Sequence, residues 1–358
     1  ETQRSWVQIE PTTLATLDKV EWEGASAGQL STAHAQRDPA GGGWINVGTE
    51  IAPPFWSKYH VFRLPDEAPS RRELLASIPC ADGAAPFWMH SFGITAEKVV
   101  LLEQPAAYSV GGMLGLASAS HGSIDWRGDD CMRVHVLDRR SGALRTHKMP
   151  AFFFFHIANT CDLPDGGVNL DICAFDDPEI LTSLLLRSLT EDDRIRDLPV
   201  SRLQRLTVPP PNAPADAACE LRPIDDISMT GGFTDLPTIN PAVAGRAGYR
   251  YVYGIAASRP TAVANRLVKT DVWQAGGDAL FEAEGTLPGE PLFVPRPGSD
   301  AEDDGVLLSM GTDSDGGSSL CILDARDMAL VARVRSPVRL PAGFHGEWWS
   351  KNAPYEGA

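Results

Sequence analysis

Hydrophobic runs and alternating stretches along the chain predict short β-strands joined by turns. Residues 152–155 are four consecutive phenylalanines, which is typical of a strand buried on both faces. The cluster 165–167, Asp-Gly-Gly, is a turn signal, and residues 168–175 have the pattern of a returning strand. The pattern therefore predicts a buried hairpin, with His156 in a turn directly after the phenylalanines.

This arrangement recurs along the chain. In six stretches a histidine or a carboxylate precedes a turn and a predicted strand; these residues are His34, His90, His156, Asp235, Glu290 and His345. A single histidine is more often a satisfied core residue than a ligand. In a chain whose strands repeat around an axis, however, equivalent positions converge on that axis. The recurrence therefore favours one shared site.

A second repeated pattern has two alternating strands joined by a turn that contains an acidic residue. Residues 133–150 and 320–337 both show it, and residues 6–22 are a looser copy. Antiparallel hairpins of this kind are expected at the outer edge of the blades of a β-propeller. Because the spacing is irregular, a large β-sandwich also fits this pattern.

Few helices are expected. Residues 178–189 predict one amphipathic helix, with Asp176 or Asp177 as its N-cap. Its buried face is predicted to contain Ile180, Leu181, Leu184 and Leu185. The proline-containing stretch 192–221 is expected to be a connector, and the acidic run 300–304 a solvated turn, because it lacks the spaced oxygen ligands of a calcium loop.

Composition narrows the classes of function. The chain has 358 residues, and its 33 glycines and 28 prolines suit many turns. The net charge of −16 argues against nucleic-acid binding, which needs clustered Lys and Arg. The six cysteines have no CxxC spacing and indicate free buried thiols in a reducing compartment. No stretch has the roughly 20 apolar residues of a transmembrane helix.

Residues 104–124 contain no Asp, Glu, Lys or Arg. Two interpretations stay open for this segment, a buried loop or short core helix, and an apolar lip that contacts a membrane or admits an apolar substrate.

Four histidines on a common axis would suit a transition metal. Neutral imidazole binds Zn, Cu, Fe and Ni. Zinc fits poorly, because catalytic zinc usually has three protein ligands and structural zinc prefers thiolates. Iron(II) prefers six ligands, so four histidines leave two positions for O2 and a substrate or water. Asp235 and Glu290 would accept the remaining N–H of each imidazole and fix its tautomer.

The histidine motifs resemble those of a known family. TAHAQRDP around His34, MHSFGIT around His90, FFHIANTCDLPDGGVNLDIC around His156 and GFHGEW around His345 are similar to the four iron-binding motifs of the carotenoid cleavage oxygenases. The resemblance extends through INPAVAGRAGYRYVYG and EPLFVPRPGSDAEDDGVLLSM and covers essentially the whole chain. It implies an all-β fold, a seven-bladed β-propeller with short helices over one face, as one domain over residues 1–358 that lacks part of the family's N-terminal sequence.

The resemblance also implies the roles of individual residues. One Fe(2+) per chain would be held by four metal-binding and catalytic histidines, His34, His90, His156 and His345. Supporting acids would be Glu1, Asp235 and Glu290. Asp235 departs from the glutamate usual in the family, and its shorter side chain is expected to leave its histidine bonded through water. Candidates for the lining of an apolar substrate tunnel are Phe92, Phe155, Phe233 and Trp348, and residues 108–119 resemble the family's membrane-facing patch.

The function that the resemblance implies is a dioxygenase, an oxidoreductase that cleaves a C=C bond of a carotenoid or apocarotenoid with O2 and gives carbonyl products. The aspartate before INP, the helix PEILTSLLLRSL and the segment SRPTAVANRLVKTDV are most similar to a plastid branch that includes carlactone synthase. The expected location is the plastid for an algal or plant source and otherwise the cytoplasm, with peripheral membrane contact.

Two alternatives remain open from the sequence. One is an isomerohydrolase of the same family, which uses iron as a Lewis acid on a retinyl ester. The other is a non-catalytic propeller that binds apocarotenoids.

Overall fold

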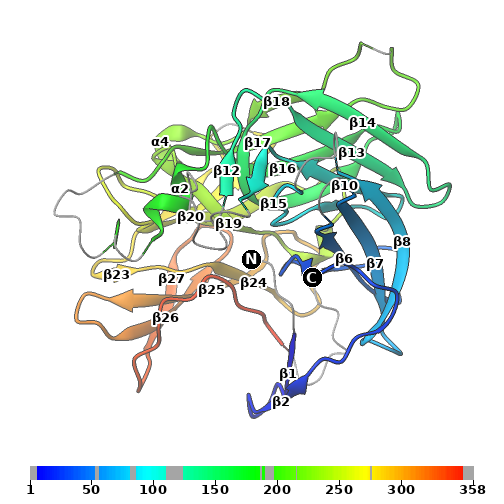
Figure 1. Cartoon of the computed structure of the whole chain (residues 1–358). Coiled ribbons are helices and arrows are strands. Elements are labelled where there is room, and N and C mark those ends of the chain that lie inside the picture. Colours follow the sequence, from blue (N-terminus) through cyan, green and yellow to red (C-terminus); the bar gives the residue numbers. More distant parts are fainter. Residues whose placement is uncertain are drawn as a thin grey trace. The chain divides into compact units, whose positions relative to one another are not determined.

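The chain folds almost entirely into antiparallel sheets (Figure 1). The computed structural model describes residues 6–52, 56–80, 86–109, 124–185, 188–189, 197–214, 216–274 and 276–349. Helical elements within them are short: α2 (Glu179–Ser183), α4 (Ile227–Thr230) and the 3-10 helix η2 (Pro241–Val243). Two compact units are formed, one by residues 1–152 and 349–358 and the other by residues 153–348. The single domain over residues 1–358 stays a prediction.

The first unit contains two larger sheets and two hairpins. The first sheet has the order β3 (Glu23–Gly24), β8 (Arg71–Pro79), β7 (Lys58–Pro65), β6 (Gly43–Glu50) and β4 (Leu30–Ser31), with β5 (Gln36–Arg37) also pairing with β6. The second has the order β14 (Leu144–Met149), β13 (Met132–Asp138), β10 (Lys98–Glu103) and β9 (Gly93–Ile94). The hairpins are β1 (Val7–Ile9) with β2 (Thr16–Lys19), and β11 (Ala106–Tyr108) with β12 (Ile124–Trp126).

The two larger sheets of the first unit each contain a histidine that connects three strands. In the first, His60 Nε2 lies 2.8 Å from Glu50 Oε2, and its Nδ1 lies 2.9 Å from Ser77 Oγ. In the second, His135 Nε2 lies 3.1 Å from Glu103 Oε2, and its Nδ1 lies 2.9 Å from Thr146 Oγ1. Both ring nitrogens of each histidine are thereby hydrogen-bonded, as burial of a polar group requires. These two histidines have a structural explanation.

The second unit contains three sheets. The first has the order β15 (Phe153–Asp162), β16 (Val168–Phe175), β17 (Ser201–Val208) and β18 (Glu220–Pro223). The second has the order β19 (Thr234–Thr238), β20 (Tyr251–Ala256), β21 (Arg266–Asp271) and β22 (Ala279–Phe281). The third has the order β23 (Thr286–Leu287), β25 (Gly305–Asp313), β26 (Ser318–Asp324) and β27 (Leu330–Arg335), and β24 (Pro291–Pro295) also pairs with β25.

The strand predictions agree well with these sheets. All three hairpins of the second repeated pattern are present, as β13 with β14, β26 with β27, and β1 with β2. The phenylalanine run is buried, and β16 spans the predicted residues 168–175. The prediction for His156 is wrong in one respect. It lies within β15, where the register with β16 shifts between Phe154 and Ile157, so an irregularity inside a strand presents it rather than a turn.

The predicted helix over 178–189 is not continuous, because residues 184–185 form a turn and a bend before residues 188–189, which are helical again. The element α2 ends at Ser183, and the side chain of Asp177 accepts a hydrogen bond from the backbone N–H of Glu179 at 2.8 Å. Ile180 is buried as predicted, whereas Leu184 and Leu185 are exposed. Because the helix stops after about one turn, the helical period does not carry these two leucines onto the face of Ile180.

The acidic run 300–304 is not a simple solvated turn. Glu302 Oε1 accepts hydrogen bonds from the backbone N–H groups of Arg250 and Tyr251, each at 2.7 Å. Asp303 pairs at 2.7 Å with Lys269, whose side chain is buried. The loop before β25 is thereby bonded to strands β20 and β21. We call residues 302–303 the acidic clasp.

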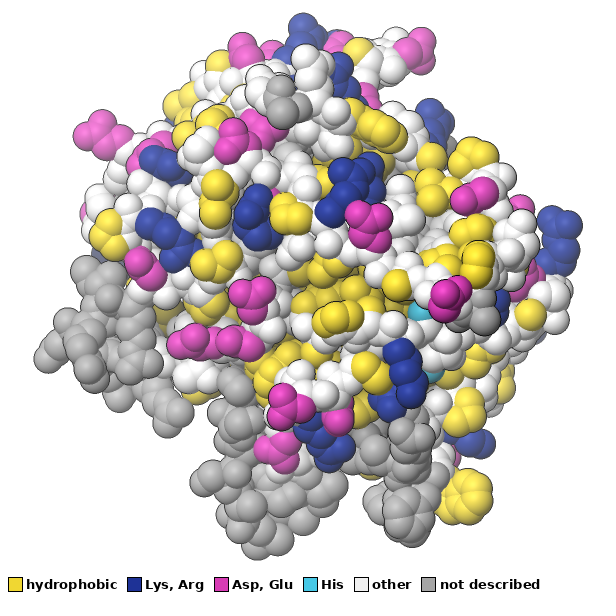
Figure 2. Space-filling view, turned by 90° about the horizontal axis from the view of Figure 1, so that it is seen from above, with side chains coloured by type: hydrophobic (Ala, Val, Ile, Leu, Met, Phe, Trp, Pro, Cys, Tyr) yellow, Lys and Arg dark blue, Asp and Glu magenta, His cyan; other side chains and the backbone are white. Residues whose placement is uncertain are grey.

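One face of the molecule carries charges of both signs. Figure 2 shows Lys and Arg side chains among Asp and Glu side chains on the face that it draws, with hydrophobic side chains gathered toward the middle of that face.

Candidate metal centre

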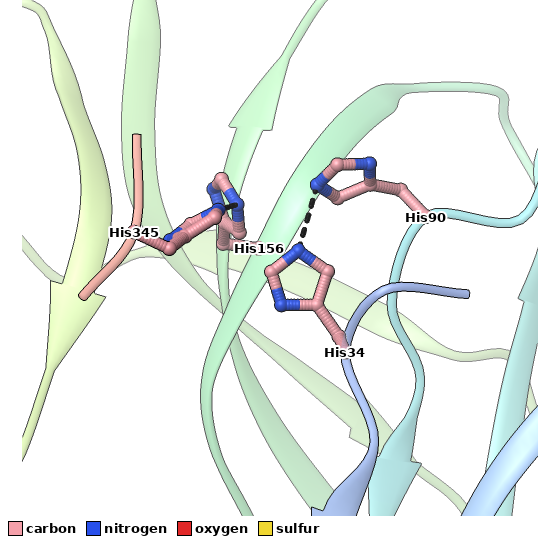
Figure 3. A group of neighbouring side chains, drawn as sticks. All are labelled: His34, His90, His156 and His345. Carbon is pink, nitrogen blue, oxygen red and sulfur yellow. Dashed lines mark hydrogen bonds between the residues drawn. The ribbon is translucent and has the colours of Figure 1, made fainter. Parts of the chain in front are cut away.

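His34 and His90 form a pair in the first unit. His34 lies between β4 and β5, and His90 lies in the segment that leads into β9. Their Nε2 atoms are 3.0 Å apart, and their ring centroids are 4.6 Å apart (Figure 3). The ring of Trp88 lies 5.1 Å from the ring of His90. The backbone N–H of His34 donates to Thr32 Oγ1 at 3.2 Å, which fixes the loop that carries this histidine.

His156 and His345 form a second pair in the second unit. Their Nε2 atoms are 3.2 Å apart, as Figure 3 shows. On the other side of each ring, His156 Nδ1 lies 2.6 Å from Asp235 Oδ1 and His345 Nδ1 lies 2.8 Å from Glu290 Oε1. Glu290 is itself held, because its Oε2 accepts a hydrogen bond from the backbone N–H of Gly346 at 2.9 Å. Each imidazole is therefore oriented by a carboxylate.

The carboxylates determine what the histidines present to each other. An ionised carboxylate only accepts hydrogen bonds, so Nδ1 of both His156 and His345 carries the proton. Both Nε2 atoms then present lone pairs at a distance of 3.2 Å. Two facing lone pairs repel each other unless a cation lies against both. The donor set therefore fits a metal ion.

The spacing of the nitrogens fits a transition metal as well. Adjacent ligands on an ion with metal–nitrogen bonds of about 2.1 Å lie roughly 3 Å apart. The Nε2 atoms are 3.0 Å apart in the His34 pair and 3.2 Å apart in the His156 pair. Each pair by itself could occupy two adjacent positions on such an ion. Imidazole nitrogens suit several first-row metals, which include zinc, copper, iron and nickel.

Asp235 reaches its histidine directly. The sequence predicted a water-mediated contact because aspartate is one methylene shorter than glutamate. The distance of 2.6 Å to His156 Nδ1 shows that this prediction is wrong. The backbone of β19 therefore lies close enough to compensate for the shorter side chain. Glu1, the third predicted acid, lies outside the described residues.

The four predicted tunnel residues lie in different surroundings. Phe92 is buried in the core of the first unit, with Met89 and Ile94. Phe155 and Phe233 are buried in the second unit, and both rings lie about 6 Å from the ring of Phe175. Trp348 is 51% exposed and lines a cavity of about 340 Å³. The tunnel stays a prediction, and most of the membrane-patch segment 108–119 lies outside the described residues.

One carboxyl group near the site was missed from the sequence. Glu347 lines the same cavity as His345 and Glu290. Although much of the residue is exposed, burial of its carboxyl group raises its pKa, and the neighbouring charge of Glu290 raises this pKa further. Its position two residues after His345 in GFHGEW is the feature of the sequence that could have indicated a place near the site.

Comparison with known proteins identifies the family. Residues 2–350 match the family described as "Retinal pigment epithelial membrane protein", and the chain belongs to this family, the carotenoid cleavage oxygenases. The resemblance predicted from the four histidine motifs is thereby confirmed.

Curated relatives are similar over nearly the whole chain. Carotenoid cleavage dioxygenase 8 homolog A, chloroplastic, of Oryza sativa subsp. japonica is 32% identical over 97% of this chain and 62% of that protein. Beta,beta-carotene 15,15'-dioxygenase of Rattus norvegicus is 30% identical over 95% of this chain and 65% of that protein. The chain thus spans less than two thirds of the length of these relatives.

Solved structures of Synechocystis apocarotenoid oxygenase have a similar fold. A mutant of that enzyme superposes with a TM-score of 0.78 at 27% identity, covering 96% of this chain and 70% of that chain. A cobalt-substituted form superposes with a TM-score of 0.77 at 28% identity over the same shares. The nearly all-sheet chain thus matches the family's seven-bladed propeller fold, and the predicted fold class is confirmed.

Proposed function

We propose that this chain carries the active site of a non-haem iron dioxygenase, which cleaves a C=C bond of a carotenoid or apocarotenoid with O2 and gives two carbonyl products. The observation that carries the proposal is the His156–His345 pair, whose Nε2 lone pairs face each other because carboxylates hold both Nδ1 protons. The names of the relatives, a carotenoid dioxygenase and an apocarotenoid oxygenase among them, supply the reaction and the substrate class.

The proposed site uses all four histidines. We propose that His34, His90, His156 and His345 hold one metal ion, because each ring can offer one nitrogen ligand. We assign one Fe(2+) per chain to them. When bound, iron(II) would supply the O2 chemistry that breaks the double bond. A relative that accepts cobalt in place of its own metal supports a site of this kind.

The protein's own residues would orient the metal ligands, place the substrate and exclude water. Asp235 and Glu290 keep the Nδ1 proton of their histidines in place, so that Nε2 stays available as a ligand. Glu1 is proposed as a third acid with the same task. Apolar walls that include Phe155 and Phe233 would exclude water and place the polyene, which is the protein's usual share of the work in a metal enzyme.

The proposed partners are a carotenoid or apocarotenoid and O2. A plastid location is supported, for a plant or algal source, by the chloroplastic relatives. We propose peripheral membrane contact through residues 108–119, where an apolar substrate could leave the bilayer. Within the described residues, no helix combines the length and the apolarity needed to cross a bilayer.

The first test is metal content. Protein purified without oxygen and reconstituted with Fe(II) is expected to bind about one iron per chain, and His156→Ala is expected to lose this iron because one of four ligands is removed. The measurement is iron per chain by elemental analysis, followed by product analysis with carotenoids and apocarotenoids in turn.

His147→Gln is the matched control, because His147 lies on β14 and has no part in the proposed site. It should keep the iron and the activity. Full iron occupancy in His156→Ala would contradict the four-histidine site. Iron binding without an O2-dependent carbonyl product would contradict the dioxygenase.

A further inference from the structure

The strand that carries Asp235 is irregular at that residue. In β19, Thr234 and Asp235 pair with Ala256 and Ile255 of β20, whereas the next pair is Thr238 with Tyr253. Between these two pairs β19 has one residue more than β20, because Asp235 to Thr238 is three steps and Ile255 to Tyr253 is two. Such an extra residue in one strand is a β-bulge. Bulges bend a strand and change the direction of a side chain. This bulge begins at the carboxylate that orients His156.

Leu236, one of the two residues of β19 that lie opposite Gly254, has an unusual backbone conformation. Its φ is +47°, in the left-handed region that non-glycine residues rarely adopt. In this conformation its backbone N–H donates to Asp235 Oδ1 at 2.8 Å, the same oxygen that lies 2.6 Å from His156 Nδ1. Asp235 Oδ1 is thus held by two groups, the backbone N–H of Leu236 and Nδ1 of His156.

Gly254 on β20 makes room for the bulge. A Cβ atom at this position would lie 2.9 Å from the carbonyl oxygen of Asp235 and 3.5 Å from Thr234 Cγ2. The distance of 2.9 Å is shorter than real Cβ atoms show. The contact is with a backbone oxygen, which cannot rotate away as a side chain could. Any side chain at residue 254 would therefore displace the Asp235 backbone by several tenths of an ångström. Such a displacement moves Asp235 Oδ1 relative to His156 Nδ1, because this oxygen is also bonded to the Leu236 N–H of the same strand.

We infer that Gly254 is a positioning residue of the proposed metal centre and acts through Asp235. It allows the bulge at Asp235 and Leu236 to lie against β20, and the bulge delivers the short aspartate side chain directly to His156. The inference rests on the proposed function, because the ion that His156 would bind belongs to it. Its effect on the metal centre would pass through the hydrogen bond between Asp235 and His156.

A double-mutant cycle tests this path. The dissociation constant for Fe(II), or for Co(II) as a stable spectroscopic substitute, is measured for the unmodified chain, Gly254→Ala, Asp235→Asn and the double variant. Loss of the hydrogen bond that orients a metal-binding histidine typically weakens metal binding about 10- to 100-fold. Gly254→Ala is expected to weaken binding within this range, and the double variant should bind like Asp235→Asn alone, because both changes remove the same interaction. Full multiplication of the two effects would overturn the inference.

Gly248→Ala is the matched control. Gly248 lies in the same unit, its ideal Cβ meets nothing within 4 Å, and its φ is not in the left-handed region. This variant should bind metal like the unmodified chain. If Gly254→Ala binds metal equally well, the positioning role is wrong.

A second readout does not need metal. The Nδ1 proton of His156, bonded to a carboxylate at 2.6 Å, should give a strongly downfield proton NMR signal in the metal-free protein. The signal should be present in the unmodified chain and Gly248→Ala, and absent or shifted in Gly254→Ala and Asp235→Asn. If the unmodified chain shows this signal but binds no metal, the proposed function fails while the positioning role stands. If Gly254→Ala keeps the signal unshifted, the positioning role fails.

Residue 236 offers an independent pair of variants, in case Gly254→Ala does not fold. Leu236→Gly permits a φ of +47°, whereas Leu236→Val disfavours it because the side chain is β-branched. The glycine variant should keep the His156 signal and the valine variant should lose it. The opposite order would overturn the role of the bulge.

Discussion

His345 illustrates how one hydrogen bond can decide whether an imidazole is a ligand. Its Nδ1 donates to Glu290 Oε1, while Glu290 Oε2 accepts from the backbone of Gly346. Glu290 therefore fixes both the ring and the chain that follows it. The same logic holds for His156 and Asp235. At this scale the important property is the position of a single proton.

Glu290→Gln should move the ring proton of His345 from Nδ1 to Nε2. An amide oxygen can keep the bond to Gly346, and the amide NH2 group then donates toward His345 Nδ1. The imidazole proton is driven to Nε2, the nitrogen proposed as the ligand. We expect metal affinity to fall about 10- to 100-fold. Metal titration measures the affinity, and nitrogen NMR of His345 reports the tautomer.

Glu284→Gln is the control, since Glu284 lies outside the proposed site. An unchanged affinity in Glu290→Gln would mean that Glu290 does not support a ligand.

Much of the candidate site was visible in the sequence. The four histidines and the acids Asp235 and Glu290 could be predicted because their surroundings repeat along the chain. The direct contact of Asp235 could not, because it depends on a bulge that Gly254 permits from the neighbouring strand. Side-chain length alone therefore gave the wrong expectation.

At the scale of elements, one carboxylate connects the sheet that contains β25. Asp313 on β25 accepts hydrogen bonds from Thr286 of β23 at 2.9 Å, Ser319 of β26 at 2.7 Å and Arg333 of β27 at 2.6 Å. The bond from Ser319 is the main reason that the pKa of Asp313 falls to about 2, with Thr286 and Arg333 adding to it. Four strands share this side chain.

The lowered pKa of Asp313 determines how the free energy of unfolding changes as the pH falls. Asp313 contributes stability above its unfolded pKa of about 3.8, and this contribution is lost as pH falls through its folded pKa of about 2. Asp313→Asn should therefore reduce the free energy of unfolding at pH 6, and the difference from the unmodified chain should shrink between pH 4 and pH 2. Urea unfolding at several pH values measures this difference.

Asp300→Asn, a change at an exposed carboxylate, should have little effect throughout this range. A difference between Asp313→Asn and the unmodified chain that stays constant down to pH 2 would contradict the linkage.

The elements that sequence reasoning missed contain charges in unexpected places. Strand β17 lies in a stretch that was expected to be a connector. Its Arg205 is buried, because both Nε and Nη2 donate to Asp171 of β16 at 2.7 Å. A buried arginine breaks the hydrophobic pattern from which strands are predicted. The acidic clasp was missed for a different reason, because its partners Arg250 and Lys269 are distant in sequence.

At the scale of the whole molecule, none of the six cysteines, all of which lie in the described ranges, forms a disulfide, as predicted. Cys80, Cys161, Cys173 and Cys321 are buried, while Cys131 and Cys219 are partly exposed. Burial raises the pKa of Cys80 to about 12 and that of Cys161 to about 11, so few thiolates form at neutral pH. The buried thiols should react only when the structure around them opens.

Thiol labelling can therefore test whether the chain unfolds as one domain. In native protein at pH 8 we expect Cys131 and Cys219 to react rapidly and the four buried thiols slowly. Cys80 lies in the first unit and Cys161 in the second, so labelling of these two along a urea titration, followed by mass spectrometry, reports each unit separately.

Coincident transitions at Cys80 and Cys161 would support the predicted single domain over residues 1–358. Two separate midpoints would contradict it. Rapid labelling of Cys80 in the native protein would contradict its burial.

The bulge at Asp235 and Leu236 limits how this chain can serve protein engineering. A designer who transplanted His156, Asp235, His345 and Glu290 onto the regular strands of another scaffold would copy every polar side chain of the second pair. The aspartate would still stop short of its histidine, because the missing reach is supplied by backbone and by the absence of a side chain at Gly254. The smallest portable unit is therefore a strand pair with its irregular register, rather than a set of residues.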